Sequence, residues 1–227
     1  MSTKDEMSPK EIKIVEAIKQ RVKEQMMSET TGHDWWHIER VFNMARRIAK
    51  EEGVRVNMFV IDLASLLHDI ADWKFHDGNE SIGPQKARDI LQEYHLDEIV
   101  ITHVTSIISE ISFKGAGVAS KMESVEGKIV QDADRLDALG AIGIARTFAY
   151  GGYKGIPIYD SRYKPTLHAS FEEYKKGSKS TINHFHEKLL LLKNRMNTKT
   201  GKKIAGERHQ FMHTFLSRFY SEWNGLS

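Results

Sequence analysis

Residues 59–70 read FVIDLASLLHDI, and almost every position before the closing His-Asp pair is apolar. A stretch of this length that is apolar nearly all round is typical of a helix buried in the middle of a domain. The two residues that end it, His68 and Asp69, carry an imidazole and a carboxylate. We therefore expect a central helix that presents two polar groups at its C-terminal end.

Helical periodicity continues on both sides of this stretch. A capping box at residues 8–11 precedes apolar residues spaced three and four apart, which predicts a first helix. A second helix is expected over about 34–53, where His37 points inward with the apolar face. No stretch alternates convincingly between apolar and polar residues, so the sequence predicts an all-α fold. Further helices are expected over about 82–94, 97–112, 133–149, 171–196 and 200–223.

The composition narrows the class of protein. Lys and Arg exceed Asp and Glu by only 33 − 31 = 2 charges, too few for a surface that tracks nucleic acid phosphates. The absence of Cys excludes disulfides and thiolate metal sites and is compatible with a reducing compartment. No apolar run approaches the roughly 18–20 residues of a membrane helix, and the charged N-terminus is unlike a secretory signal. We expect a cytoplasmic protein with neither a membrane nor a nucleic acid as partner.

Residues 151–169, GGYKGIPIYDSRYKPTLHA, form a long segment without helical periodicity. The segment combines glycines and aromatic residues with three cations, and Asp160 is its single acid. Irregular segments of this length are uncommon in compact domains and often serve as lids over a site. A disordered or solvated surface loop is the alternative interpretation.

Three separated fragments carry candidate metal donors. They are His37 in HDWWHIERV, the pair His68-Asp69, and the carboxylates of VQDADRLDALG at 130–140. Two imidazoles and two carboxylates suit an octahedral divalent ion with open positions for water, such as Mn²⁺, Mg²⁺, Fe²⁺, Co²⁺ or Ni²⁺. Each histidine by itself would more often be a core residue bonded to a backbone carbonyl than a metal ligand. Four unpaired polar groups in a helical core would be costly, however, which favours a shared metal.

The order His, His-Asp, Asp on successive helices resembles the HD-domain superfamily of metal-dependent phosphohydrolases, especially its small bacterial members. The segments HDWWHIERV, ASLLHDIAD and VQDADRLDALGAIGIAR carry the resemblance. It implies an all-helical HD-domain bundle with a C-terminal helical extension. We expect a single HD-type domain over 1–227. Within it, we expect the core at about 30–150, the long loop at 151–169 and C-terminal helices over 170–223.

The resemblance implies that His37, His68 and Asp69 bind one divalent ion, with an aspartate of the Asp132-Ala133-Asp134-Arg135 run as the last ligand. We prefer Asp134, because the last ligand of the family typically lies in an Asp-Arg-Leu-like context. Asp132 is the alternative, and it can instead support the other ligands from behind.

Other residues receive roles beside these ligands. Asp72, one turn after Asp69, matches an acidic position of the family and is expected to act as general base or to orient the nucleophile. A surface carboxylate at a helix end would look the same. Arg135 can offer a two-pronged contact to phosphate oxygens, the alternative being a salt bridge to a nearby acid. His103 is expected to line the site or contact a phosphate, or else to be a buried structural histidine.

The resemblance and the residues together predict a phosphohydrolase that acts on nucleoside or deoxynucleoside phosphates, with triphosphates favoured. One divalent ion, Mn²⁺ by preference, would activate the attacking water. Lys154, Arg162 and Lys164 are expected to contact the substrate. The alternatives are a cyclic nucleotide or dinucleotide phosphodiesterase, and a regulatory module that binds metal or nucleotide without turnover. The sequence determines neither base nor sugar nor oligomeric state, and a homodimer is compatible with it.

A second histidine pair lies on the expected last helix. His209 and His213 have the i, i+4 spacing of a metal-binding helix face, but they lack the glutamate of the HExxH motif. The sequence therefore favours an ordinary surface pair.

Overall fold

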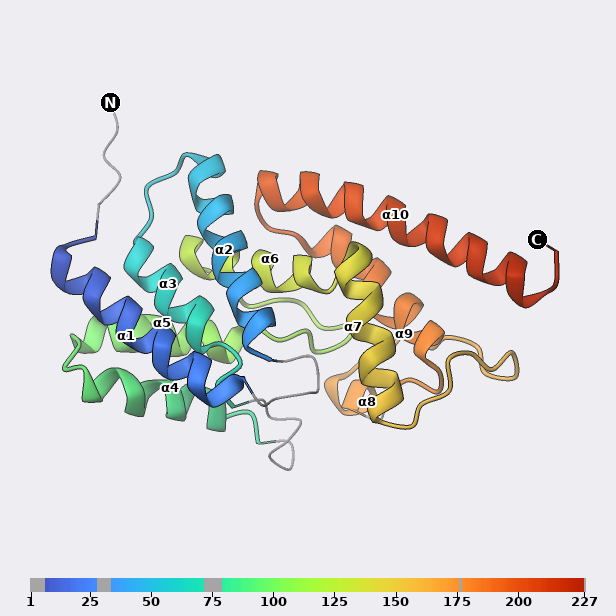
Figure 1. Cartoon of the computed structure of the whole chain (residues 1–227), viewed down its shortest axis with the longest axis horizontal. Helices are drawn as coiled ribbons and strands as arrows, with labels where there is room; N and C mark the ends of the chain where they lie inside the picture. The colour runs from blue at the N-terminus through green and yellow to red at the C-terminus, as the bar shows by residue number, and fades with distance from the viewer. Residues whose placement is uncertain (1–6, 28–33, 72–78, 176, 227) are drawn as a thin grey trace. The chain divides into compact units, whose positions relative to one another are not determined.

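The computed structural model describes residues 7–27, 34–71, 79–175 and 177–226, and these ranges contain helices and connecting segments but no strand (Figure 1). The predicted all-α fold is confirmed. The described chain separates into two compact units. The first comprises the chain up to Phe113 together with Ser120–Asp134, and the second comprises Lys114–Ala119 together with the chain from Arg135 onward. The expectation of one domain remains a prediction. None of the described helices is both long enough and apolar enough to cross a membrane.

The first unit is built around the predicted central helix. The helix α3 (Met58–Leu67) packs against three others, and every side chain from Phe59 to Leu67 is buried. Its neighbours are α1 (Pro9–Met26), α2 (Trp35–Glu52) and α5 (Glu98–Glu110), and α4 (Ile82–Glu93) packs on α5. The helix is shorter than the expected 59–70, because it ends at Leu67 with His68 as its C-cap. The two polar residues therefore lie where the chain leaves the helix.

Local signals in the sequence set the ends of these helices. The capping box at Ser8 and Glu11 is present, with both hydrogen bonds made. Asp34 caps α2 at one end, and Gly53 ends it in the left-handed conformation, with φ 66°. Between α2 and α3, the guanidinium of Arg46 binds the fully buried carboxylate of Asp62 through two hydrogen bonds of 2.8 and 2.6 Å. A charge buried this deeply needs such a partner.

The prediction of one helix over 133–149 is wrong in its boundaries, because these residues are divided between two helices. The helix α6 (Val125–Asp137) ends before α7 (Gly140–Tyr153) begins. Gly140 adopts φ +73°, a left-handed conformation that other residues avoid, and a Cβ there would lie 3.0 Å from the Arg208 side chain. The helical period of the sequence continues through the break between α6 and α7, so the period alone does not reveal the break.

The second unit contains the C-terminal helices. The single helix expected over 171–196 is also wrong. It is divided into α8 (Phe171–Lys175), α9 (Thr181–Glu187) and the 3₁₀-helix η2 (Leu189–Arg195). Gly177, with φ +72°, and the new N-cap Ser180 interrupt it. The long last helix α10 (Lys199–Trp223) packs on α7 and η2, close to the expected 200–223.

Candidate metal centre

The helix α2 places His37 in the interior of the first unit. Its N-cap residue Asp34 accepts a hydrogen bond of 2.9 Å from the backbone N–H of His37, so this histidine lies in the first turn. The neighbouring Ile38 and Val41 are fully buried on the same helix, and the His37 side chain is buried with them. The inward orientation expected from the spacing is confirmed.

The end of α3 fixes the second imidazole. His68 is the C-cap residue, and its Nδ1 lies 2.8 Å from the backbone carbonyl oxygen of Ser65. A carbonyl only accepts hydrogen bonds, so Nδ1 must carry the proton. The Nε2 atom of a neutral His68 therefore keeps its lone pair, which is the form that binds metal ions.

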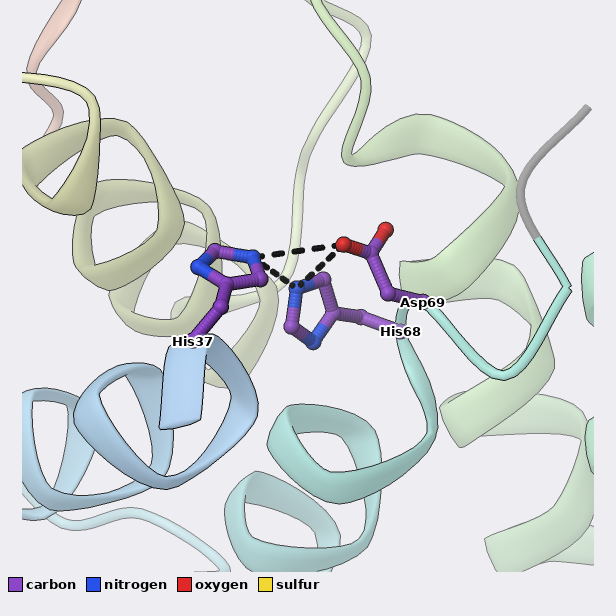
Figure 2. Close-up of side chains that lie close together, drawn as sticks. All are labelled: His37, His68 and Asp69. Carbon is purple, nitrogen blue, oxygen red and sulfur yellow. Dashed lines mark hydrogen bonds and ion pairs between the residues drawn. The ribbon is translucent and has the colours of Figure 1, made fainter. Parts of the chain in front are cut away.

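The side chains of His37, His68 and Asp69 point toward one another (Figure 2). The two Nε2 atoms lie 3.1 Å apart, and Asp69 Oδ2 is 3.2 Å from Nε2 of His37 and 3.6 Å from Nε2 of His68. Both histidines are buried, and the Asp69 side chain is only 15% exposed. The helix α2 and the two residues that follow α3 thus bring three donor atoms to one point.

This arrangement fits a divalent metal ion. For metal–ligand bonds of about 2.1 Å and angles of roughly 90–109°, neighbouring donor atoms lie about 3.0–3.4 Å apart. Two of the three observed separations, 3.1 and 3.2 Å, fall within this range, and the third, 3.6 Å, is slightly longer. In the neutral form of His68, the proton on Nδ1 leaves Nε2 without a hydrogen to donate to the other two atoms. The three residues could therefore hold one ion.

Asp134 lies beside this group, on α6. Its Oδ1 atom is 3.5 Å from Nε2 of His37 and 3.9 Å from Nε2 of His68, and its side chain is 30% exposed. Asp132 is fully buried two residues earlier. This geometry supports Asp134 as the fourth ligand and Asp132 as a supporting residue, and the assignment remains a prediction.

Two further predicted site residues have local partners. His103 on α5 lies 3.7 Å from Glu126, measured between Nε2 and Oε2. Arg135 is buried, and its Nη1 donates a hydrogen bond to the backbone carbonyl of Arg195 within the second unit. Their roles toward phosphate remain predictions. Asp72, the predicted general base, lies outside the described residues.

The long segment expected to act as a lid is tied to α9. The first two backbone N–H groups of α9, at Thr181 and Ile182, donate to the carbonyls of Pro157 and Ile158, at 2.8 and 3.0 Å. Farther along, the N–H of Thr166 donates to a Glu187 carboxylate oxygen at 2.9 Å. Unsatisfied N–H groups at a helix start are common hydrogen-bond donors, and here they hold the loop.

The three loop cations differ in their surroundings. The ammonium of Lys154 lies over the rings of Tyr150 and Tyr153, 5.9 and 5.4 Å from their centres. Arg162 is paired with Asp160 through its Nε and Nη2 atoms, and its side chain is 80% exposed. Lys164 is exposed. Their contacts with substrate remain predictions.

Two contributors to the site were not assigned a role from the sequence. The carbonyl of Ser65 fixes the proton on His68, and the Asp34 carboxylate fixes the start of the helix that carries His37. Asp34 could have been identified by its N-cap position three residues before His37. Nothing in the side chain of Ser65 signals the role of its backbone carbonyl.

Comparisons with known proteins identify the family of this chain. Residues 35–139 match the family model of the HD domain. Protein YpgQ of Bacillus subtilis is 36% identical over 218 residues, which cover 96% of this chain and 97% of YpgQ. The crystal structure of YpgQ in complex with ADP superimposes on this chain with a TM-score of 0.70 and 32% identity. The superposition covers 94% of this chain and 100% of the YpgQ chain.

Two other crystal structures are similar along nearly their whole length. A Lactobacillus plantarum protein has a TM-score of 0.85 and 35% identity, over 97% of this chain and 100% of that chain. An HD-superfamily hydrolase from Bacillus thuringiensis has a TM-score of 0.71 and 42% identity, over 94% of this chain and 98% of that chain. The chain therefore belongs to the HD-domain superfamily of hydrolases, a class of metal-dependent phosphohydrolases.

Proposed function

We propose that this hydrolase acts on nucleotides, with nucleoside and deoxynucleoside triphosphates as the favoured substrates. The observation that carries the proposal is the convergence of two imidazole nitrogens and a carboxylate oxygen, with separations of 3.1–3.6 Å. The nucleotide class is supported by the complex of the similar protein YpgQ with ADP. Triphosphates are favoured by the resemblance to small bacterial HD proteins and by the cations of the 151–169 loop.

The protein residues of the site would bind the metal ion and orient the reacting groups. His37, His68, Asp69 and Asp134 would hold one divalent ion, which when bound neutralises charge on phosphoryl oxygens and makes water a stronger nucleophile. The Ser65 carbonyl, which holds the proton of His68 on Nδ1, would leave the Nε2 lone pair available to this ion. Asp72 remains the residue proposed to accept the proton of the attacking water as general base or to orient this water. Arg135 remains the proposed contact for charge on the phosphoryl group.

We infer Mn²⁺ as the preferred ion from the chemistry of the donors. The proposed set mixes two imidazole nitrogens with two carboxylate oxygens and contains no sulfur ligand. Carboxylate and water ligands suit Mn²⁺ and Mg²⁺, whereas imidazole favours the transition metals. Manganese accepts both types of donor in an octahedral geometry, which leaves two positions for water and substrate.

A panel of phosphate compounds, assayed with Mn²⁺ and after chelation, tests the proposed substrate class. We expect kcat/KM for the release of phosphate or pyrophosphate from nucleoside triphosphates to exceed kcat/KM for a simple aryl phosphate by about tenfold or more. The difference would come from about two or three charge-assisted contacts with the triphosphate. Chelation should abolish both activities. Cleavage of cyclic dinucleotides alone would contradict the proposal, and bound nucleotide without any turnover would favour the regulatory module.

The loop cations give a second expected result. The net charge of +2 provides little long-range attraction, so capture of a triphosphate must depend on local cations. Replacing Lys154, Arg162 and Lys164 together by Gln should raise KM for a triphosphate roughly tenfold, with little change for an aryl phosphate and none in metal content. Lys154 and Lys164 should account for most of the effect, because Asp160 already binds Arg162.

A matched control distinguishes this effect from a general loss of charge. Replacing the exposed Lys199, Lys202 and Lys203 on α10 by Gln removes the same three charges and should leave both KM values unchanged. An equal rise in KM for both substrates in the loop variant would instead show a structural role for the loop.

A further inference from the structure

The second unit contains a pair of imidazoles that the proposed hydrolase chemistry does not use. His209 and His213 lie one turn apart on α10, and their Nε2 atoms are 3.0 Å from each other. Their ring centres are 4.5 Å apart, with the ring planes inclined at 70°. Both side chains thus direct the same nitrogen toward one point beside the helix. His213 is exposed there, so the point is open to solvent.

The electrostatic setting favours a neutral ring at His209. Burial, together with the nearby charges of His213 and Lys193, lowers the pKa of His209 below its ordinary value. Burial and His213 also lower the pKa of His186, which lies on α9 and contacts Tyr220 of α10. A neutral imidazole has a lone pair for a metal ion, whereas an imidazolium has none.

The distance between the two nitrogens corresponds to a coordination angle of roughly 90°. For metal–nitrogen bonds of about 2.05 Å, a separation of 3.0 Å gives an N–metal–N angle of 2 arcsin(1.5/2.05), or about 94°. An angle near 90° joins neighbouring positions of a square-planar or octahedral ion. A tetrahedral ion would require about 109°, a separation near 3.3 Å. Square-planar and tetragonal sites with nitrogen ligands are typical of Cu²⁺ and Ni²⁺.

We propose that His209 and His213 form a second metal site, which binds Cu²⁺ or Ni²⁺ through both Nε2 atoms and leaves the remaining positions to water. The site is independent of the proposed hydrolase centre in its ligands, since His37, His68, Asp69 and Asp134 belong to the first unit. The positive charge of Lys193 opposes a bound cation, so the site should release its ion more readily than a site with three or four protein ligands.

Titration of tag-free protein with Ni²⁺, followed by calorimetry, tests the proposal. The wild type should bind one Ni²⁺ more than His213→Gln does, because the ions taken up elsewhere are common to both proteins. His209→Gln should also lose this additional Ni²⁺ ion, or bind it at least about tenfold more weakly. With Cu²⁺, the electron paramagnetic resonance spectrum of the wild type should show coupling to two imidazole nitrogens at this site.

A rearranged pair provides the matched control. The double substitution His213→Gln/Thr214→His keeps the number of histidines but turns the second ring by about 100° around the helix. It should behave like His213→Gln. His68→Ala should keep the second site, which separates this proposal from that of the hydrolase centre. Equal Ni²⁺ binding by the wild type and His213→Gln, or full binding by the rearranged pair, would overturn the proposal.

Discussion

His68→Ala is expected to abolish metal binding at the proposed centre and to lower phosphohydrolase activity by roughly three orders of magnitude or more. The substitution removes one of three donor atoms that converge within 3.1–3.6 Å. The helix before it should remain folded, because the buried side chains of α3 and its packing on α1, α2 and α5 are unaffected. Metal content, turnover and helical circular dichroism check the three parts of this result.

A histidine outside the site serves as the matched control. His95 is exposed and adopts φ 52°, a conformation that Asn tolerates better than most residues. His95→Asn should therefore retain the metal content and activity of the wild type. Full activity of His68→Ala at modest Mn²⁺ concentration would show that the ligand assignment is wrong.

Asp134→Asn is expected to reduce metal affinity by about a hundredfold or more, because an amide oxygen replaces a charged ligand. Its Oδ1 atom lies 3.5 Å from the nearer imidazole nitrogen, and its side chain is 30% exposed. Asp132→Asn, in contrast, should retain at least part of the bound metal. Equilibrium dialysis with Mn²⁺ measures both variants, and each is the control for the other.

The opposite pattern in this pair of variants would have a specific meaning. Loss of metal in Asp132→Asn with retention in Asp134→Asn would show that the assignment is displaced by two residues along α6. The membership in the HD-domain superfamily would be unaffected, since it rests on the match over residues 35–139 and on the similar proteins.

The sequence predicted the helical fold well where burial and local capping agree. The stretch 59–67 is buried on every side, and Asp34 and Gly53 mark both ends of α2 as observed. Prediction failed where a backbone conformation interrupts an unbroken helical period. Gly140 and Gly177 adopt positive φ values, which a periodicity of side chains does not reveal. Gly in a helical pattern has several meanings, and the surrounding fold decides between them.

The metal donors of the candidate site could be predicted from the sequence, but the contacts that fix their protonation and surroundings could not. The order of His37 and the His68-Asp69 pair in two of the motif fragments identified the residues that the structure brings together. The backbone carbonyl that fixes the His68 proton comes from α3 itself and has no sequence signature. The surroundings of the loop cations were equally hidden, because the pairing of Arg162 with Asp160 depends on the local turn of the chain.

Anomalous X-ray diffraction from crystals grown with Mn²⁺, recorded at the manganese edge, tests the central claim most directly. The account predicts one strong peak about 2.0–2.3 Å from Nε2 of His37, Nε2 of His68 and a carboxylate oxygen of Asp69, with Asp134 as the fourth protein ligand. A protein that binds Mn²⁺ with no peak in contact with His37 and His68 would contradict it.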